Sequence, residues 1–274
     1  MNVAMRKSLL VGGLMQLAAV AAFLVMACGC ETLPAPPINI LSTQQEVQLG
    51  RELADEIEEQ KPIHGDVELQ EYVRGIGQRL ARVAPRQDVA YRFTVIDEPD
   101  TVNAFALPGG HMYLYTGLMQ LAENEAELAG VMAHEIGHVV ARHHGERLTR
   151  MYGYNLLVRV LLGDDPGAAA NIASNLVEMN FSRENERQAD AIAVELLWRA
   201  GYDPGAMLTF MEKMREQEQR RGAAPSLPFL SSHPPTQERI ALIRQHITRY
   251  PAGERAQRSA NAAEYHEHVL NRLP

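Results

Sequence analysis

The chain has 274 residues, with 26 Lys and Arg against 34 Asp and Glu, a formal net charge of −8 and 46% hydrophobic residues. This length and apolar fraction are those of a globular protein that buries a sizeable core, and they exclude an intrinsically disordered or collagen-like chain. The acidic balance, without any stretch that mixes dense Lys or Arg with aromatic residues, argues against nucleic-acid binding.

Residues 1–27 have the pattern of an export signal. An uncharged apolar stretch, residues 9–27, follows basic residues at the start of the chain, and no acidic residue precedes Glu31. The end of this stretch, Val-Met-Ala before Cys28, resembles a bacterial lipobox. We therefore expect cleavage before Cys28 and its lipidation, with Cys30 as the other candidate. Because these are the two cysteines of the chain, the body is expected to have no disulfide or thiol chemistry.

The leader also indicates where the protein acts. Residues 28–41 are rich in proline and form a predicted tether between a lipid anchor and the folded domain. We expect a lipid-anchored protein of the bacterial cell envelope that faces the periplasm, and Gly29 after the cysteine resembles the outer-membrane sorting class. The alternative is a retained anchor in the inner membrane, because residues 9–27 approach the roughly 20 apolar residues that span a bilayer.

Two helices are expected at the start of the folded domain. Ser42 followed by Gln45 is a capping-box signal, which predicts a helix that runs to about residue 60. A second amphipathic helix is predicted at residues 66–83.

Short strands are expected next. Alternating apolar residues predict strands at residues 91–96, 102–107 and 111–115, and a Pro-Gly-Gly turn joins the last two. Together they predict a small sheet.

From residue 116 onward the pattern is helical almost to the end of the chain. The predicted fold class is therefore α+β and mostly helical. We expect one domain at residues 42–250, followed by a short polar tail at residues 251–274.

The segment from His134 to His138 reads H-E-I-G-H and lies in a helical pattern expected over residues 123–144. On a helix, residues four apart lie on one face about 6 Å apart along the axis, so both imidazoles can bind one zinc ion while Glu135 stands beside them. Apolar residues surround the segment. Two buried histidines and a glutamate need polar partners there, and a metal supplies one.

A catalytic zinc needs a third protein ligand and an open position for water. One candidate is His144, at the last position of the metzincin pattern H-E-x-x-H-x-x-G-x-x-H, but Ala141 replaces the glycine of that pattern. A helix that continues through Ala141 carries His144 off the ligand face. The other candidate, which we favour, is Glu186.

Glu186 belongs to a predicted helix that Ser182 caps. Glu186 and Asp190 fall on one helical stripe with small and apolar residues, whereas Glu184 points away from it, so the first two acids are expected to face inward. Glu186 would bind zinc, and Asp190 would accept the outer N–H of a ligand histidine. The other histidines have no ligand spacing and are expected to be structural or exposed: His64, His111, His143, His246, His266 and His268.

These segments resemble the gluzincin metallopeptidases of peptidase family M48. The resemblance rests on H-E-I-G-H, E-N-E-R-Q-A-D at residues 184–190, N-A-F-A-L-P-G-G at residues 103–110, and S-H-P-P with E-R at residues 232–239, and it spans about residues 41–250. It implies a zincin-like metalloprotease domain with a small β-sheet beside the H-E-x-x-H helix, and one Zn²⁺ per chain. Within the family, the chain resembles the exported, single-domain bacterial lipoproteins.

The expected mechanism is hydrolysis of peptide bonds. Glu135 would take a proton from the attacking water and pass it to the leaving amine. The resemblance assigns His233, in the late His-Pro motif, as a donor to the oxyanion. An edge strand would pair with an extended substrate through its backbone. The residues of this expected strand are Asn103, Ala104, Phe105 and Ala106.

The predicted function is a zinc endopeptidase of the envelope that cleaves misfolded or unassembled exported proteins, a substrate class that the resemblance implies. Its expected partners are unfolded or misfolded polypeptides and, through the lipid anchor, the membrane. No nucleic-acid partner is expected, and the sequence does not determine the oligomeric state. The alternative is a latent, chaperone-like module that binds clients and has a gated zinc site. Residues 151–179 are expected to be either core packing or a lid over the cleft.

Overall fold

The computed structural model describes residues 39–177, 179–221, 227–258 and 260–273. The predicted signal peptide, Cys28 and the tether up to residue 38 lie outside the described residues. None of the helices in these four ranges combines the length and the apolar character needed to cross a membrane. The elements are α2 (Thr43–Gln60), α3 (Val67–Ala81), β1 (Arg92–Ile96), β2 (Ala104–Ala106), η1 (Pro108–Gly110), β3 (His111–Tyr115), α4 (Thr116–Leu121), α5 (Glu125–Val140), α6 (His143–Leu161), α7 (Pro166–Val177), α8 (Arg183–Ala200), α9 (Gly205–Arg221), α10 (Pro228–Ser232), α11 (Gln237–Ile247), α12 (Ala252–Arg255), α13 (Ala262–His268) and η2 (Leu270–Arg272).

The sheet has the strand order β1-β3-β2, so β2 lies at one edge of it. Strand β1 runs parallel to β3, with Phe93 opposite Met112, and β2 runs antiparallel to β3, with Phe105 opposite Tyr113. All three predicted strands are present, the second in a shorter form. A mostly helical α+β fold with a small sheet is therefore confirmed.

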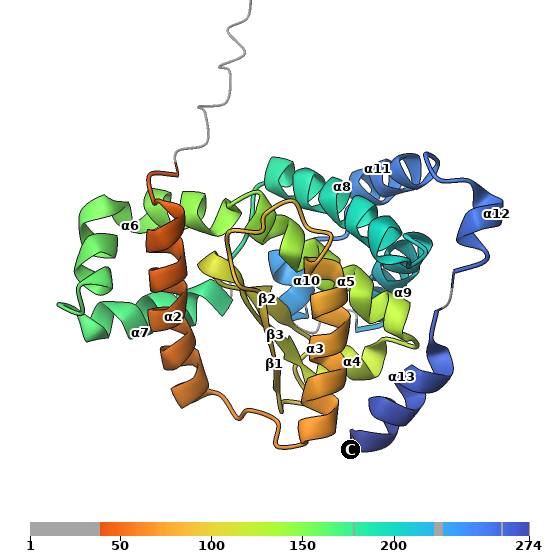
Figure 1. Cartoon of the computed structure of the whole chain (residues 1–274), viewed down its shortest axis with the longest axis horizontal. Coiled ribbons are helices and arrows are strands. Elements are labelled where there is room, and N and C mark those ends of the chain that lie inside the picture. Colours follow the sequence, from red (N-terminus) through yellow and green to blue (C-terminus); the bar gives the residue numbers. More distant parts are fainter. Residues whose placement is uncertain (1–38, 178, 222–226, 259, 274) are drawn as a thin grey trace, which may run out of the picture. The chain divides into compact units, whose positions relative to one another are not determined.

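The sheet separates two apolar clusters, because successive residues of a strand point to opposite faces. Val95 and Leu114 belong to a cluster that contains α3 and α5. Phe105 and Tyr113 belong to a second cluster, which contains α2, α6 and α7. Figure 1 shows α2, α6 and α7 on one side of the sheet and α3 and α5 on the other.

Helix α5 carries the H-E-I-G-H motif through the first cluster, where it packs against α3, α8 and α9. Asn124 caps the start of the helix by accepting the Glu127 backbone N–H. Glycine is required where the neighbouring helix comes closest: a methyl group on Gly137 would lie 2.7 Å from the carbonyl oxygen of Ala189 in α8. This close approach brings polar side chains of α5 and α8 together.

The motif helix ends earlier than we expected. Instead of continuing through residues 123–144, the helix stops before Arg142, which adopts the left-handed conformation with φ 61°. An ion network stabilises this turn, in which the buried Glu46 accepts from Arg142 Nε at 3.0 Å and from Arg86 Nη2 at 2.6 Å. Arg86 also donates to the Val139 carbonyl, which satisfies one of the acceptors at the helix end.

Residues that separate the motif helix from α8 pack on the second cluster. Ile172, Ala173 and Leu176 of α7 are buried there, and α7 contacts α2. This is the core-packing arrangement considered above for residues 151–179, and a lid function for the segment stays a prediction.

The described part of residues 251–274, which we expected to be a polar tail, contains α12, α13 and η2. Tyr265 is fully buried in the first cluster, and its hydroxyl donates to the Met119 carbonyl at 2.7 Å. Val269 is buried beside it. The segment thus packs onto the domain.

Candidate metal centre

Four side chains converge in one buried cluster: His134 and His138 from α5, Glu186 from α8 and His233 from the end of α10. One nitrogen or carboxylate oxygen of each residue lies within 4.8 Å of the others. The Nε2 atoms of His134 and His138 are 3.1 Å apart, and the Glu186 carboxylate lies 3.5 and 3.4 Å from them. Nδ1 of His233 is 3.2 Å from Nε2 of His134 and 2.9 Å from Oε1 of Glu186.

The spacing of these atoms suits one metal ion. Bonds of about 2.0–2.2 Å to a tetrahedral zinc place ligand atoms roughly 3.3–3.6 Å apart, close to the observed separations. Converging imidazole nitrogens cannot all donate to one another, and Oε1 of Glu186 lies 3.4 Å from Nε2 of His138 and 2.9 Å from Nδ1 of His233. A cation would satisfy these atoms. The residues present therefore fit a metal centre with nitrogen and oxygen ligands.

The local sequence explains how Glu186 reaches the cluster. Ser182 and Asn185 form a capping box that fixes the start of α8. From this start, Glu186 and Asp190 face inward and are buried, whereas Glu184 is exposed. The structure thus places the two acids on the inward stripe that the helical period predicts.

Asp190 contacts His134 from outside the cluster. Its Oδ1 lies 2.9 Å from Nδ1 of His134, so that Nε2 of the same ring faces the other ligand atoms. Burial by itself would lower the pKa of His134, but the hydrogen bonds and charges of Asp190 and Glu186 outweigh it and raise the pKa to about 9. Asp190 therefore lies where a partner of the ligand histidine was expected.

His143 does the same for the second histidine, and nothing in its spacing indicated this. Nδ1 of His143 lies 2.9 Å from Nδ1 of His138, and Nε2 of His143 lies 3.2 Å from the side-chain oxygen of Gln188. The network is complete if His138 donates to His143 and His143 donates to Gln188. This tautomer leaves Nε2 of His138 free to bind a metal. His143 reaches this place because Arg142 turns the chain.

Arg239 is a second residue whose role the sequence did not reveal, although it belongs to the late motif. Its Nε and Nη2 donate to the two oxygens of Asp190 at 2.8 and 2.7 Å. Its Nη1 lies 2.6 Å from Oε2 of Glu186 and donates to the Pro234 carbonyl at 3.0 Å. Burial raises the pKa of Asp190, but the hydrogen bond and charge of Arg239 lower it by more. One buried guanidinium thus pairs with two buried carboxylates.

Glu135 lies beside the cluster rather than in it. The side chain is buried, and neither carboxylate oxygen has a hydrogen-bond partner among the described residues. Nε2 of His233 is 3.4 Å from its Oε1. Burial raises the pKa of Glu135, against the opposing charges of His233 and His134. A carboxylate with a raised pKa is a better proton acceptor, which suits a general base.

His233 lies within the cluster, a position that its motif in the sequence did not specify. Its Nδ1 lies among the ligand atoms, and its ring packs between Phe181 and Phe229, with centroid distances of 5.6 and 5.0 Å. In this conformation His233 fills the fourth position of the cluster. Its role as an oxyanion donor stays a prediction.

The other candidate ligand, His144, is not in the cluster. The residue is buried, but its ring centroid lies 6.0 Å from that of His138 and it packs edge-on against Phe181. Among the described residues, the group that could hold a metal contains Glu186 and not His144.

The expected substrate strand lies next to the predicted base. β2 contacts α5. Burial raises the pKa of Glu135, and the polar backbone of Ala106 in β2 lowers it by a smaller amount. Asn103 precedes the strand, and its Oδ1 accepts the Ala104 backbone N–H at 3.0 Å. Phe105 faces the second cluster. Pairing of this edge with a substrate stays a prediction.

Comparisons with known proteins agree with this geometry. The model of the family described as Peptidase family M48 matches residues 68–247. The chain is 33% identical over 216 residues to the beta-barrel assembly-enhancing protease of Escherichia coli (strain K12), which covers 74% of this chain and 44% of that protein. It is 32% identical over 227 residues to the putative beta-barrel assembly-enhancing protease of Vibrio cholerae, which covers 78% and 46%.

A eukaryotic relative is also similar. The chain is 34% identical over 177 residues to the mitochondrial metalloendopeptidase OMA1 of Schizosaccharomyces pombe, which covers 64% of this chain and 52% of that protein. The chain thus spans about half the length of the curated relatives it matches. The matched family region contains the whole cluster of His134, His138, Glu186 and His233. The prediction of a metallopeptidase domain is therefore confirmed, and the chain belongs to peptidase family M48.

Proposed function

We propose that the protein is a zinc-dependent endopeptidase of the bacterial envelope that hydrolyses misfolded or unassembled exported proteins. One observation carries the proposal: within the described part of the chain, the buried carboxylate oxygens of Glu135 have no hydrogen-bond partner, next to the converging atoms of His134, His138 and Glu186. A purely structural metal site gives such a carboxylate no role, whereas a hydrolytic site needs it as a base.

The residues divide the work of peptide hydrolysis. When bound, zinc supplies Lewis acidity, lowering the pKa of water to about 7 and polarising a carbonyl. His134, His138 and Glu186 would hold it, while Asp190 and His143 keep the two imidazoles oriented. Glu135 takes a proton from the attacking water and delivers it to the leaving amine.

The surroundings of the site support an unfolded substrate. β2 is an edge strand, and pairing of an extended chain with such an edge runs through the backbone, which gives little sequence selectivity.

The site of action is inferred from the sequence and the relatives. The E. coli relative is named a beta-barrel assembly-enhancing protease, and the V. cholerae relative a putative one. The lipobox-like residues before Cys28 add a lipid anchor, with the domain facing the periplasm and the outer membrane as the favoured location. An inner-membrane anchor formed by residues 9–27 is the competing arrangement.

A second function, a latent protein that binds clients through a gated site, is favoured by His233. Its Nδ1 takes the fourth place among the ligand atoms, which is the place that attacking water needs. If this arrangement persists in solution, the protein holds zinc without cleaving peptides until the segment around α10 moves.

The test compares the full-length wild-type protein with Glu135→Gln and a matched control, Glu184→Gln, in which an exposed glutamate of α8 is changed instead. Zinc content and cleavage of an unfolded protein are measured for all three. We expect zinc in all three proteins, cleavage by wild type and Glu184→Gln, and a loss of about 10²–10⁴-fold in Glu135→Gln, the contribution of a general base.

The other outcomes separate the two functions. Zinc in every protein without cleavage in any supports the latent client-binding protein. Wild-type protein that binds no zinc contradicts the ligand set of His134, His138 and Glu186.

A further inference from the structure

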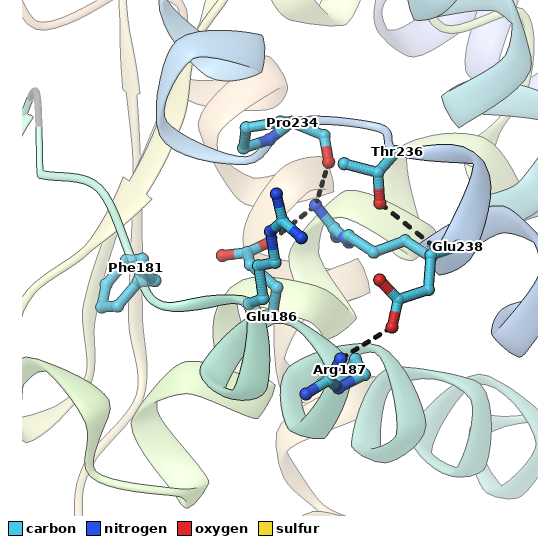
Figure 2. Close-up of a pocket in the computed structure, with 8 residues that line it drawn as sticks. Phe181, Glu186, Arg187, Pro234, Thr236 and Glu238 are labelled. Atoms are coloured by element: carbon cyan, nitrogen blue, oxygen red, sulfur yellow. Dashed lines mark hydrogen bonds and ion pairs between the residues drawn. The ribbon is translucent and has the colours of Figure 1, made fainter. Parts of the chain in front are cut away.

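A cavity of about 190 Å³ lies beside Glu186, between the first turns of α8 and the segment that leads from α10 into α11 (Figure 2). Phe181 lines one side of it and Pro234 another. The Phe181 ring also lies 4.0 Å from the ring of His138, measured between centroids. An occupant of this cavity would therefore be separated from the candidate metal ligands by no more than one side chain.

The cavity offers one free cation and one that is easily released. Among the described residues, Arg183 lines the cavity and makes no hydrogen bond or ion pair. Arg187 also lines the cavity and bonds Glu238 at 2.7 Å (Figure 2), and it pairs with Glu184 as well. Both of these glutamates are more than half exposed. Such surface pairs contribute little, so another carboxylate can replace them.

The acidic side chain of Glu186 lines the cavity and has cationic and polar partners within the protein. It lies 2.6 Å from Nη1 of Arg239, and its other oxygen faces the histidine cluster. Arg239, which also pairs with Asp190, offsets part of the Glu186 charge, and a bound metal ion would offset more of it. The hydroxyl of Thr236, which lines the cavity, adds a donor. The lining contains three arginines and two glutamates, and two of the arginines, Arg187 and Arg239, also pair with Glu184 and Asp190.

We propose that this cavity is a substrate subsite for a carboxylate, supplied by an acidic side chain or by the C-terminus of a peptide, with Arg183 as the residue that recognises it. The inference rests on the proposed function, because it assigns substrate selectivity to the same metal centre. The cavity is smaller than the roughly 300–1,000 Å³ of whole small-molecule sites, so it suits one side chain or chain end. The Arg183 guanidinium would donate charge-assisted hydrogen bonds to the substrate carboxylate, and its planar shape matches that of a carboxylate.

The test measures kcat/KM for peptides that differ at one position. Quenched fluorescent peptides carry Glu, Gln or Lys at each position on either side of the cleaved bond, and each has a free or an amidated C-terminus. The wild-type protein should prefer Glu over Gln by roughly tenfold at one position, and 0.5 M salt should reduce the preference because the cavity opens to solvent. A preference that follows the free C-terminus instead identifies the chain end as the source of the carboxylate.

The decisive variant is Arg183→Glu, with Arg199→Glu as its control, since Arg199 lies on the same helix and is exposed in a surface pair. Arg183→Glu should invert the preference, so that the Lys peptide is cleaved faster than the Glu peptide, and the control should keep the wild-type preference. Equal ratios in wild type and Arg183→Glu, or no preference for Glu or a free C-terminus in wild type, would overturn the subsite.

Failure of the proposed function is read separately. Fluorescence anisotropy measures binding of the same peptides to zinc-loaded Glu135→Gln protein, in which no turnover is needed. Tighter binding of the carboxylate peptide to Glu135→Gln supports the subsite, even if wild type cleaves nothing, provided that the double variant Glu135→Gln/Arg183→Glu no longer shows it. Identical binding of the Glu and Gln peptides, and of the two C-terminal forms, overturns it.

Discussion

At the scale of single residues, the centre depends on a balance of buried charge. Glu186 and Asp190 are buried, and Arg239 bonds to both of them. Removing one partner of a buried ion pair leaves an uncompensated charge in a medium of low dielectric constant, which costs more than the pair itself contributes. Arg239 thus positions the candidate ligand Glu186, and it also positions Asp190, which contacts the candidate ligand His134.

Arg239→Leu should destabilise the metal-free protein by about 3–5 kcal/mol, because two carboxylates lose their cation. Arg244→Leu is the matched control, since Arg244 lies on the same helix in an exposed pair with Glu212 and should cost no more than about 1 kcal/mol. Urea unfolding in EDTA measures both. Arg239→Lys should fall between them, because a lysine cannot bond both acids. Equal unfolding midpoints for the two leucine variants would contradict this role.

The sequence revealed the residues whose spacing follows one helix. His134 and His138 are four apart, and Glu186 and Asp190 share a stripe, so the 3.6-residue period alone placed each pair on one face. It did not reveal His143 or Arg239 as partners, because their contacts join segments that no local period relates. The place of His233 in the cluster likewise depends on how α10 packs.

At the scale of elements, the site depends on how closely α5 and α8 approach. Gly137 lies in α5 between the two ligand histidines in sequence, and Ala189 of α8 comes so close to it that no side chain fits there. The helical pattern predicts both helices, but α5 ends before the predicted residue 144. The turn at Arg142 is stabilised by Glu46 and Arg86, which come from distant segments. Helix periods predict where a helix is amphipathic, and long-range ion pairs decide where this one stops.

Gly137→Ala should therefore weaken the protein, although alanine is the better helix former. Its methyl group would lie 2.7 Å from the Ala189 carbonyl oxygen and 3.0 Å from its Cα, which forces the helices apart at a cost of about 1–3 kcal/mol. Gly75→Ala is the control, because nothing lies within 4 Å of its added methyl group in α3. That variant should gain about 0.5–1 kcal/mol.

Two measurements check this pair of glycines. Urea unfolding should shift in opposite directions for the two variants. Zinc content after dialysis should fall in Gly137→Ala and stay at the wild-type level in Gly75→Ala, since only the first displaces Glu186 from the histidines. Stabilisation by Gly137→Ala would show that the helix contact is looser than the structure indicates.

At the scale of the whole molecule, the cluster joins parts of the chain that are far apart in sequence. The ligand atoms come from α5, α8 and the end of α10, while the sheet and the first apolar cluster position α5. The fold class followed from the sequence because strands and helices have distinct periods. The packing of α13 onto the core did not, because a short segment with one buried tyrosine has no recognisable period.

Zinc should therefore stabilise the whole fold. A ligand that binds only the folded state adds about 2.7 kcal/mol at a concentration 100 times its Kd, which corresponds to a Tm increase of roughly 5–11 °C for a domain of this size. Thermal unfolding is followed in EDTA and then with zinc added back in excess. The Tm of wild type should fall in EDTA and recover with zinc but not with Mg²⁺, because nitrogen ligands disfavour magnesium. Glu186→Gln supplies a weaker ligand and should respond much less at the same zinc concentration. A wild-type Tm that is indifferent to zinc would mean that the four side chains are held together by protons and Arg239 alone.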